Sequence, residues 1–242
     1  IDLEDFTYDI NRSIGNKPQV NEEALWFSYE VINNFSKLKL DSKKLTFFTT
    51  GTVAKTVPAL LKKISNDGHE ISSHYFYHDL MANQDIKTVE EGFVKSIEAI
   101  ESATGKIPKG FRSPAFSIPP SRKDIFDLVI KYFEYDSSYI LNTPELYSGK
   151  YREDNIFLSE NFTEFPIIPK PFFKGKLNIK SGGTYLRVFP KELIRQVMDF
   201  NFSNNFIPQV YMHPYDYLVN KEFWVDYEYF KKQKFVKGLI SW

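Results

Sequence analysis

The sequence predicts a single α/β domain over residues 1–242, with the architecture of an irregular (β/α)7-type barrel. Two observations predict this fold. Strand-like segments alternate with helix-like segments along most of the chain, which indicates parallel strands joined by helices. The alternation amounts to about six or seven βα units in 242 residues, a usual size for one barrel, and no repeat or linker interrupts it.

The composition supports a folded domain and restricts its partners. Apolar residues make up 42% and aromatic residues 17%, which is enough for a core. Because 31 Lys and Arg balance 31 Asp and Glu, charge gives no reason to expect nucleic acid or an anionic membrane as the main partner. No stretch approaches the roughly 18 apolar residues of a membrane segment. No signal peptide is visible, but the chain begins at Ile1 without methionine, so a removed upstream segment is an open alternative.

The N-terminal half is predicted to run strand, helix, strand, helix, strand. Its strands are expected at 1–6, 44–50 and 69–74, of which 44–50 is rich in aromatic and β-branched residues. Asn21 precedes the amphipathic segment 22–35 and is a suitable N-cap for a helix. The next helix has Pro58 in its first turn and Gly68 at its end, as proline and glycine prefer.

The C-terminal half continues the alternation. Strands are expected at 109–114, 133–138, 164–168 and 207–213, and helices at 88–104, 122–133 and 190–200. Thr88 and Glu91 form a capping box for the first of these helices, and Ser121 and Asp124 open the second in a similar way. Residues 141–184, rich in Asn, Pro, Gly and Lys, are expected to form long loops or an irregular insertion.

Polar side chains lie at the ends of several predicted strands. They are Asp2, Glu4, Asp5, His74, His78, Arg112, Asp136 and His213. Taken singly, each has an ordinary structural explanation as a cap, a turn residue or a surface charge. In a βα barrel, however, the carboxyl ends of the strands meet at one face, where the chemistry takes place. Their joint placement therefore predicts one site that combines a metal centre, a carboxylate base, a cation and a further histidine.

The segment HEISSHYFYH at 69–78 holds three of the four histidines. On a helical turn, the spacing of His74 and His78 would place two imidazoles on one face. With one carboxylate they would form a three-ligand site that keeps an open position, as in catalytic zinc centres. The chain has no cysteine, so a metal must bind to His, Asp or Glu. We therefore expect one divalent metal, zinc by preference, and we expect His69 to belong to the scaffold.

Five motifs in order make the chain resemble the polysaccharide deacetylase (NodB-homology) family of carbohydrate esterases. They are IDLED, a long block ending in HYFYH, GFRSPAF, FEYDSS and VYMHPYD. The stretches DLED, YDSS, SGGTYLRVFP and HPYD are most similar to the branch found in exopolysaccharide gene clusters. The resemblance covers nearly the whole chain. It implies a bacterial hydrolase of carbon–nitrogen bonds other than peptide bonds, acting in the cytoplasm or cell envelope, that removes N-acetyl groups from an amino-sugar polysaccharide and releases acetate.

The resemblance also implies a metal site and a base. His74 and His78 match the family's metal histidines, and Asp2 matches its catalytic base. Asp5 is the first choice for the metal carboxylate. The family usually has two acids that are adjacent or one residue apart, whereas DLED has three acids in four positions. Glu4 could therefore be the metal ligand in place of Asp5, or the base with Asp5 as the ligand. Strand alternation keeps this alternative, since it puts Asp2 and Glu4 on one face.

Further roles follow from the other motifs. Arg112 matches the arginine that orients the base, His213 matches the catalytic histidine, and Asp136 matches the aspartate that tunes it. Tyr185 and Arg187 are expected to line or support the sugar-binding edge of the pocket, with a plain turn into the next helix as the alternative.

One departure and two rival functions remain. Tyr75 stands where the family has a small hydroxyl residue that steadies the histidine loop, so this loop is expected to be held differently. The same fold could serve an amidase acting on a small cyclic amide or a peptidoglycan fragment. A catalytically inactive sugar-binding domain is the other rival, but it would not need every catalytic residue type that this chain retains.

Overall fold

The computed structural model describes residues 1–39, 43–141 and 162–216. At its centre lies a six-stranded sheet in which each strand pairs in parallel with the next one along the chain. The strands are β1 (Asp2–Leu3), β2 (Thr46–Thr49), β3 (Glu70–Ser73), β4 (Gly110–Phe111), β5 (Tyr135–Asp136) and β6 (Thr163–Glu164). Parallel strands in chain order, with helices between them, form the βα arrangement that the sequence predicts.

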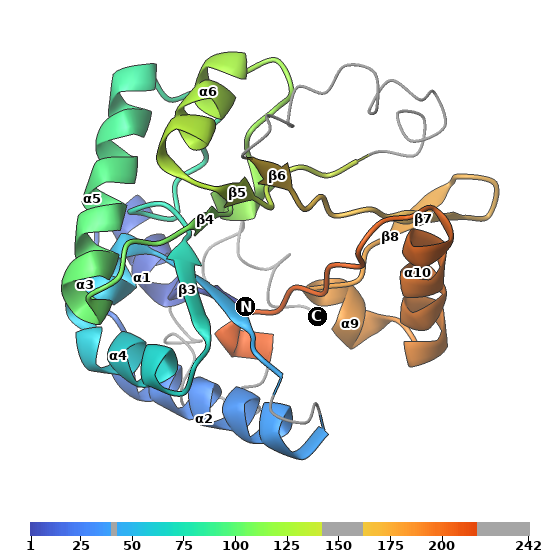
Figure 1. The fold of residues 1–242 in the computed structure, drawn as a ribbon, viewed down its shortest axis with the longest axis horizontal. Helices are drawn as coiled ribbons and strands as arrows, with labels where there is room; N and C mark the ends of the chain where they lie inside the picture. Colours follow the sequence, from blue (N-terminus) through green and yellow to red (C-terminus); the bar gives the residue numbers. More distant parts are fainter. Residues whose placement is uncertain (40–42, 142–161, 217–242) are drawn as a thin grey trace.

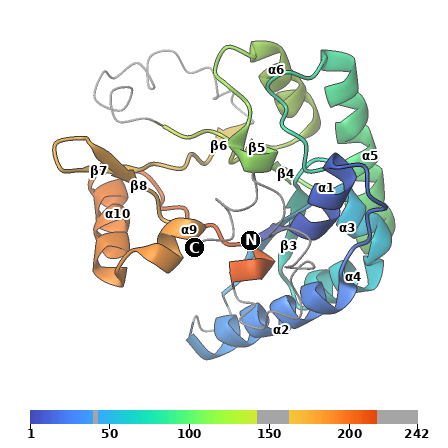
Figure 2. The same cartoon turned by 180° about the vertical axis from the view of Figure 1, so that it is seen from behind.

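Most helices cover the outer side of this sheet (Figure 1). They are α1 (Phe6–Ser13), α2 (Glu22–Lys39), α3 (Gly51–Thr56), α4 (Pro58–Asn66), α5 (Ile86–Thr104) and α6 (Lys123–Tyr132). A second group lies on the other side, as the view from behind also shows (Figure 2). It contains β7 (Lys170–Phe172), β8 (Leu177–Ile179), α9 (Thr184–Val188) and α10 (Lys191–Ser203). None of the helices in the described residues is long and apolar enough to span a bilayer.

Two clusters of buried side chains hold these layers together. One cluster packs α2, α3 and α4 against β1 and β2, and includes the fully buried Leu3, Phe47 and Leu60. The other packs α5 and α6 against β4, and includes the fully buried Phe93 and Phe111. Burying each such side chain contributes roughly 1.5–3 kcal/mol. The two clusters therefore fix the strands whose ends carry the polar residues.

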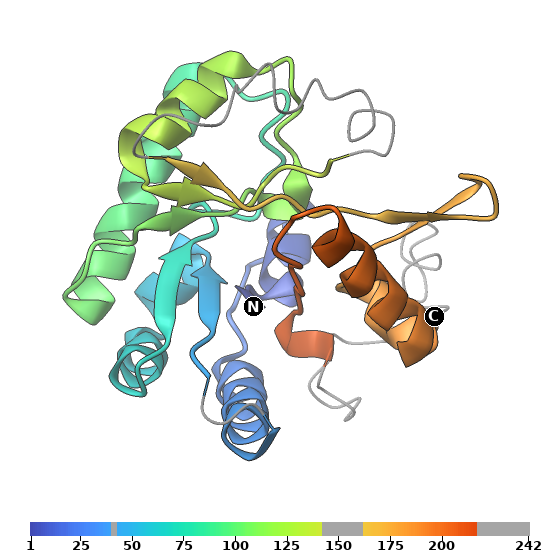
Figure 3. The ribbon, with the colours of Figure 1, turned by 45° about the vertical axis from the view of Figure 1, so that its right-hand side comes forward.

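The expected strand at 207–213 is irregular, but it closes the barrel beside β1. Asp2 N donates a hydrogen bond of 2.8 Å to Met212 O, and Gly183 N donates one of 2.9 Å to Tyr211 O. Figure 3 shows this segment passing next to the N-terminus. Gly182 allows the two segments to pack closely here, since a Cβ at this position would lie 2.2 Å from the Tyr211 ring.

The helix ends agree with the sequence in part. Asn21 caps α2 as expected, because Ala24 N donates to its Oδ1 at 3.0 Å. The cap of α5 is Asp85 rather than the predicted Thr88, whose N–H donates to the Asp85 side chain. Helix α6 has Arg122 rather than Ser121 at its cap position and no side-chain cap, and Asp124 pairs with Arg122.

Candidate active site

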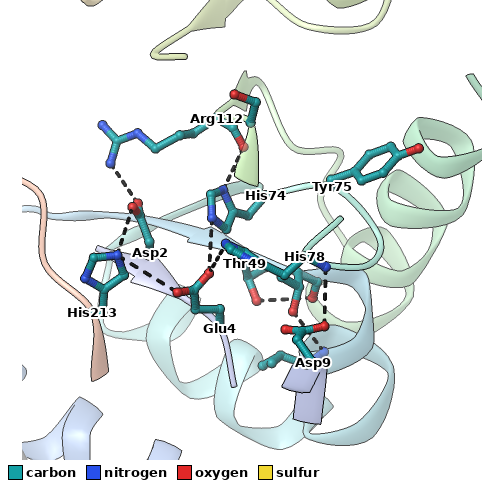
Figure 4. Close-up of polar contacts among 12 residues, drawn as sticks. Asp2, Glu4, Asp9, Thr49, His74, Tyr75, His78, Arg112 and His213 are labelled. Carbon is teal, nitrogen blue, oxygen red and sulfur yellow. Dashed lines mark hydrogen bonds and ion pairs between the residues drawn. The ribbon is translucent and has the colours of Figure 1, made fainter. Parts of the chain in front are cut away.

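The ends of β1, β3 and β4 and the segment that closes the barrel bring the predicted polar residues together (Figure 4). Asp2 lies in β1, and Glu4 follows it. His74 follows β3, and Arg112 follows β4. His213 comes from the closing segment next to β1. The structure thus places these five side chains at one point, as the barrel argument predicts.

Glu4 lies between the two histidines of the HYFYH segment. Its Oε2 atom is 3.4 Å from His74 Nε2 and 2.6 Å from His78 Nε2. Glu4 and His74 are buried, whereas His78 is partly exposed. Burial alone would raise the pKa of Glu4, but the adjacent His78 and His74 hold it well below its usual range. Glu4 is therefore an ionised carboxylate in contact with two imidazoles.

These three residues suit a divalent metal ion. Their ligand atoms all lie within 4.8 Å of one another. Glu4 Oε2 is buried and accepts no aligned hydrogen bond from the described residues. His74 Nδ1 lies 2.7 Å from Arg112 O, and because a carbonyl only accepts, Nδ1 carries the proton. The Nε2 atom of neutral His74 is then free to bind a metal, as is usual for metal-binding histidines.

The first choice of carboxylate, Asp5, is not placed at the histidines. Its Oδ1 accepts a hydrogen bond of 3.1 Å from Tyr8 N, which makes it the N-cap of α1. Its Oδ2 accepts one of 2.6 Å from Asn21 N. With both oxygens bound to backbone N–H groups, Asp5 begins the helix. The alternative carboxylate, Glu4, lies beside the two histidines, where the metal carboxylate was expected.

The histidine pair also differs from the helical turn that its spacing suggests. Residues 74–79 form no helix, and the chain reverses at Tyr75, whose φ is 68°. The reversal brings the two rings to a centroid distance of 5.4 Å. The left-handed backbone conformation of Tyr75, rather than a helical turn, therefore brings both imidazoles into contact with Glu4.

Asp2 forms a buried ion pair with Arg112. Arg112 Nη1 donates to Asp2 Oδ1 at 2.7 Å, and both side chains are 3% exposed. Burial would raise the pKa of Asp2, but Arg112, His74 and His213 lower it to about 2. Arg112 is itself held by Ser137, to whose backbone oxygen and hydroxyl it donates at 3.2 and 2.8 Å. Asp2 is therefore ionised at neutral pH and held in a fixed direction.

His213 faces the two acids from the other side. Its Nε2 atom lies 3.8 Å from Asp2 Oδ2 and 3.9 Å from Glu4 Oε1. Its Nδ1 atom lies 3.1 Å from Asp216 Oδ2, and its ring stacks on Tyr215 at 4.7 Å. Burial would lower the pKa of His213, but the bond to Asp216 and the charges of Asp2 and Glu4 raise it. The protonated imidazolium is thus favoured.

Asp136 does not contact His213, and the expectation that it tunes this histidine is not met. Asp136 is fully buried at the end of β5, where Ser138 Oγ donates to its Oδ1 at 2.6 Å. Its neighbour across the sheet is Glu164 in β6. Burial raises the pKa of Asp136 to about 6 and, together with the charge of Asp136, raises the pKa of Glu164. Asp216, three residues after His213 in the HPYD motif, holds the imidazole instead.

Two functional candidates were therefore missed by the sequence reasoning, Asp216 and Glu164. The HPYD motif contained the signal for Asp216, since His213 N also donates to its Oδ2 at 2.8 Å. Arg187 joins this group, because its Nε lies 3.1 Å from Asp216 Oδ1. Tyr185 stacks on Phe189 at 5.9 Å. Glu164 is brought to Asp136 only by the pairing of β5 and β6, which has no local signal in the sequence.

The third histidine of the segment, His69, belongs to the scaffold as expected. Leu45 N donates to its Nδ1 at 3.3 Å, so Nε2 carries the proton and can donate to Asn33 Oδ1, also at 3.3 Å. The ring packs against Tyr29 and Phe47. These contacts lie at the opposite, amino-terminal end of β3, away from Glu4.

Comparison with known proteins shows what this chain is similar to. Residues 31–127 match the family model described as polysaccharide deacetylase. The Bacillus subtilis protein YlxY, itself uncharacterised, is 36% identical over 85 residues, which are 35% of this chain and 26% of that protein. The peptidoglycan-N-acetylglucosamine deacetylase of Bacillus cereus is 33% identical over 78 residues, 32% of this chain and 28% of that enzyme. The chain thus covers less than a third of the length of these relatives.

A solved structure supports the barrel. It comes from Mycobacterium smegmatis, was assigned as a polysaccharide deacetylase, and matches with a TM-score of 0.54 at 20% identity. The match covers 86% of this chain and 71% of that one. At this identity the likeness concerns the fold, and it confirms the predicted irregular (β/α)7-type barrel.

Proposed function

The chain belongs to the polysaccharide deacetylase (NodB-homology) family, and from this premise we propose that it is a metal-dependent hydrolase of N-acetylated polysaccharide. It removes acetyl groups from the amino sugars of a cell-surface polymer or exopolysaccharide and releases acetate. One observation carries the proposal. A buried, arginine-held carboxylate, a Glu–His–His cluster and a histidine that favours its protonated form all converge on one point.

In this proposal the metal ligands are Glu4, His74 and His78, and the metal is zinc. One carboxylate and two imidazoles are the donor set of many catalytic zinc sites. A zinc ion bound there would acidify a water molecule and polarise the acetyl carbonyl. The contribution of the chain is to hold the three donors together, with Glu4 and His74 buried and His78 partly exposed.

Asp2 acts as the general base. The attacking water must lose a proton as it adds to the acetyl carbon, and an ionised carboxylate next to the Glu4 cluster can accept that proton. The ion pair with Arg112 keeps Asp2 ionised and directs its second oxygen, Oδ2, toward His213 rather than into the core. Arg112 therefore serves as a positioning residue.

His213 acts as the general acid. When the C–N bond of the acetamide breaks, its electron pair goes to nitrogen, and the amine leaves readily only if it receives a proton. The Nε2 atom of His213 points toward Asp2 and Glu4, where that bond would lie. Asp216 holds the opposite nitrogen, which favours the imidazolium. The products are acetate and a free amino sugar.

The substrate assignment within the family is also part of the proposal. The named relative from Bacillus cereus acts, by its name, on peptidoglycan N-acetylglucosamine. The motifs DLED, YDSS, SGGTYLRVFP and HPYD favour an exopolysaccharide instead. We therefore expect faster acetate release from N-acetylglucosamine oligomers than from peptidoglycan fragments.

The test combines acetate release with metal content in a short set of variants. Wild-type protein loaded with zinc should release acetate from N-acetylglucosamine oligomers. Asp2→Asn should lose activity and keep the metal, whereas His74→Ala and Glu4→Gln should lose both. Asp5→Asn is the matched control, because the single amide oxygen of asparagine can keep the N-cap bond from Tyr8 N; the variant loses the bond from Asn21 N and some stability, but it should keep metal and activity.

Three results would contradict the proposal. A wild-type protein that binds neither zinc nor cobalt has no such metal site. A protein that binds zinc but releases no acetate from any oligomer supports the rival amidase or the sugar-binding domain. Loss of metal in Asp5→Asn but not in Glu4→Gln would return the ligand role to Asp5.

A further inference from the structure

The loop that joins the two histidines, residues 74–79, contains a bulky residue in a strained backbone conformation. Tyr75 has a φ of 68°, in the left-handed region. For a non-glycine residue this conformation costs roughly 1–2 kcal/mol, and an aromatic residue in it is an outlier. Such strain persists only where the surroundings impose it, and it is frequent at functional sites. Figure 4 shows the Tyr75 ring pointing away from both histidines.

Hydrogen bonds hold the backbone of Tyr75 from both sides. Its N–H donates to Ser73 Oγ at 3.2 Å. Its carbonyl accepts from Gly51 N at 2.9 Å, at the start of α3, and from Ser96 Oγ at 3.1 Å, in α5. Ser73, Gly51 and Ser96 are all buried, so these bonds are shielded from water.

The side chain of Tyr75 fills a socket in α5. The ring is 3% exposed and packs edge-on against Phe93 at 5.7 Å. Its hydroxyl lies 2.9 Å from Gln84 Oε1 and 3.1 Å from Thr88 O, within donating distance of both. The socket depends on Gly92, since a Cβ there would lie 2.2 Å from the ring. Where the resemblance implies a small hydroxyl residue, this chain therefore holds the loop by a buried aromatic ring and its hydroxyl group.

The far end of the loop is held by α1. The guanidinium of Arg12 pairs with Asp79 and lies 4.4 Å above the ring of Tyr77. Asp9 Oδ1 accepts a long hydrogen bond of 3.4 Å from His78 N. Contacts from α1 therefore reach three consecutive residues of the loop, while Tyr75 fixes its beginning.

We propose that Tyr75 is a positioning residue that, with Arg12 at the far end, holds the loop so that His74 and His78 keep their Nε2 atoms on one point. This inference rests on the proposed function for what the site binds. A loop that is already ordered pays no further conformational entropy when its ligand binds. Loosening it should therefore weaken zinc binding, even though Tyr75 touches no zinc ligand atom.

The test measures zinc affinity by competition with a fluorescent chelator. Tyr75→Ala should weaken zinc binding roughly 10-fold or more, the loss expected when a supporting residue of a metal site is removed. Tyr75→Phe keeps the ring in its socket and should stay within about threefold of wild type. Arg12→Met should give an intermediate loss. Phe133→Ala is the matched control, because Phe133 is a buried ring of the same cluster, 5.4 Å from Phe93, and lies away from the loop.

Hydrogen exchange on zinc-free protein provides a second measurement that does not depend on the function of the site. The amides of residues 75–79 should exchange faster in Tyr75→Ala and not in Phe133→Ala. If wild type binds no zinc, the proposed function fails, and the exchange result alone decides whether Tyr75 anchors the loop. Unchanged zinc affinity or unchanged protection in Tyr75→Ala would overturn the inference, and so would an equal loss of affinity in Phe133→Ala.

Discussion

The buried acid pair of Asp136 and Glu164 predicts that the protein loses stability as the pH rises above about 4. The two residues are 0% and 7% exposed and lie opposite each other in β5 and β6. Asp136 Oδ2 and Glu164 Oε2 are buried and accept no hydrogen bond from an N–H or hydroxyl group of the described residues. Burial raises the pKa of Asp136 to about 6 and raises the pKa of Glu164 well above its usual range, with the charge of Asp136 adding to the rise.

The sign and size of the effect follow from these shifts. In the unfolded chain both acids lose their protons near pH 4. Above that pH these two acids bind more protons in the folded state than in the unfolded state, so the contribution of the pair to stability is full below about pH 4 and falls as the pH rises. One pKa unit corresponds to about 1.4 kcal/mol. A rise of the Asp136 pKa from 3.8 to about 6 therefore amounts to a loss of about 3 kcal/mol by pH 7, and Glu164 extends the loss further.

Glu164→Gln should remove the part of this dependence that comes from Glu164 itself and reduce the part that comes from Asp136. Glutamine keeps the shape of the side chain, so its Oε1 can still accept from Tyr139 N, a bond that is 3.1 Å long in the wild type. Its amide group can also donate to ionised Asp136, which glutamate can do only when it is protonated. We expect the free energy of unfolding at pH 8 to rise by about 1–3 kcal/mol relative to wild type, and the gain to vanish near pH 4.

Urea denaturation followed by tryptophan fluorescence between pH 4 and pH 8 measures both quantities. Glu134→Gln is the matched control, because Glu134 comes just before β5 but is 64% exposed and pairs with Lys109. It should leave the pH dependence unchanged. If Glu164→Gln has the slope of wild type, or lowers stability equally at both ends of the range, the acid pair does not produce the pH dependence and the reasoning is refuted.

Three further predictions concern the closing segment. His213→Ala should keep zinc and fold but lose kcat by roughly a hundred- to ten-thousand-fold, and near-full kcat would show that another group is the acid. Asp216→Asn should lower the pKa of His213, because the bond to Asp216 raises it, so the high-pH limb of the kcat profile should move to lower pH; an unmoved limb would contradict this role. Gly182→Ala should lower the free energy of unfolding by roughly 1–3 kcal/mol, because its Cβ would clash with Tyr211, and an unchanged urea midpoint would contradict the close contact.

The alternation of strands and helices could be predicted from the sequence because it depends on local patterns. The apolar strands at 44–50 and 69–74 and the helix after Asn21 appear where the pattern places them. The strand at 207–213 was expected from the same pattern but is irregular in the structure. Its backbone carbonyls accept single hydrogen bonds from Asp2 N and Gly183 N, and they do not form the repeated hydrogen bonds of a β-ladder. Local composition indicates an extended segment, whereas ladder formation depends on distant partners.

The location of the candidate site was predictable for the same reason, and the detailed partners were not. His74, Arg112 and His213 meet because parallel strands end at one face, which is a rule of the fold. The pairing of Asp136 with Glu164, by contrast, is set by the register of β5 and β6 across 28 positions of sequence. A buried acid that meets another acid prefers its neutral form. This makes Asp136 a poor partner for an imidazolium and leaves that role to Asp216, the acid nearest to His213 in sequence.

The choice between Glu4 and Asp5 depended on a short helix. Helix α1 has only eight residues and none of them is buried, and a segment this short does not fill the window of about 11–18 residues in which apolar periodicity identifies a helix. Had α1 been recognised, its start would have excluded Asp5 as a metal ligand. An aspartate at an N-cap gives its oxygens to backbone N–H groups, and Asp5 does so to Tyr8 and Asn21. Glu4 then remains as the acid that shares a face with Asp2 and contacts His74 and His78. In a motif with three acids, the residue that begins the next helix is therefore the one to exclude first as a ligand.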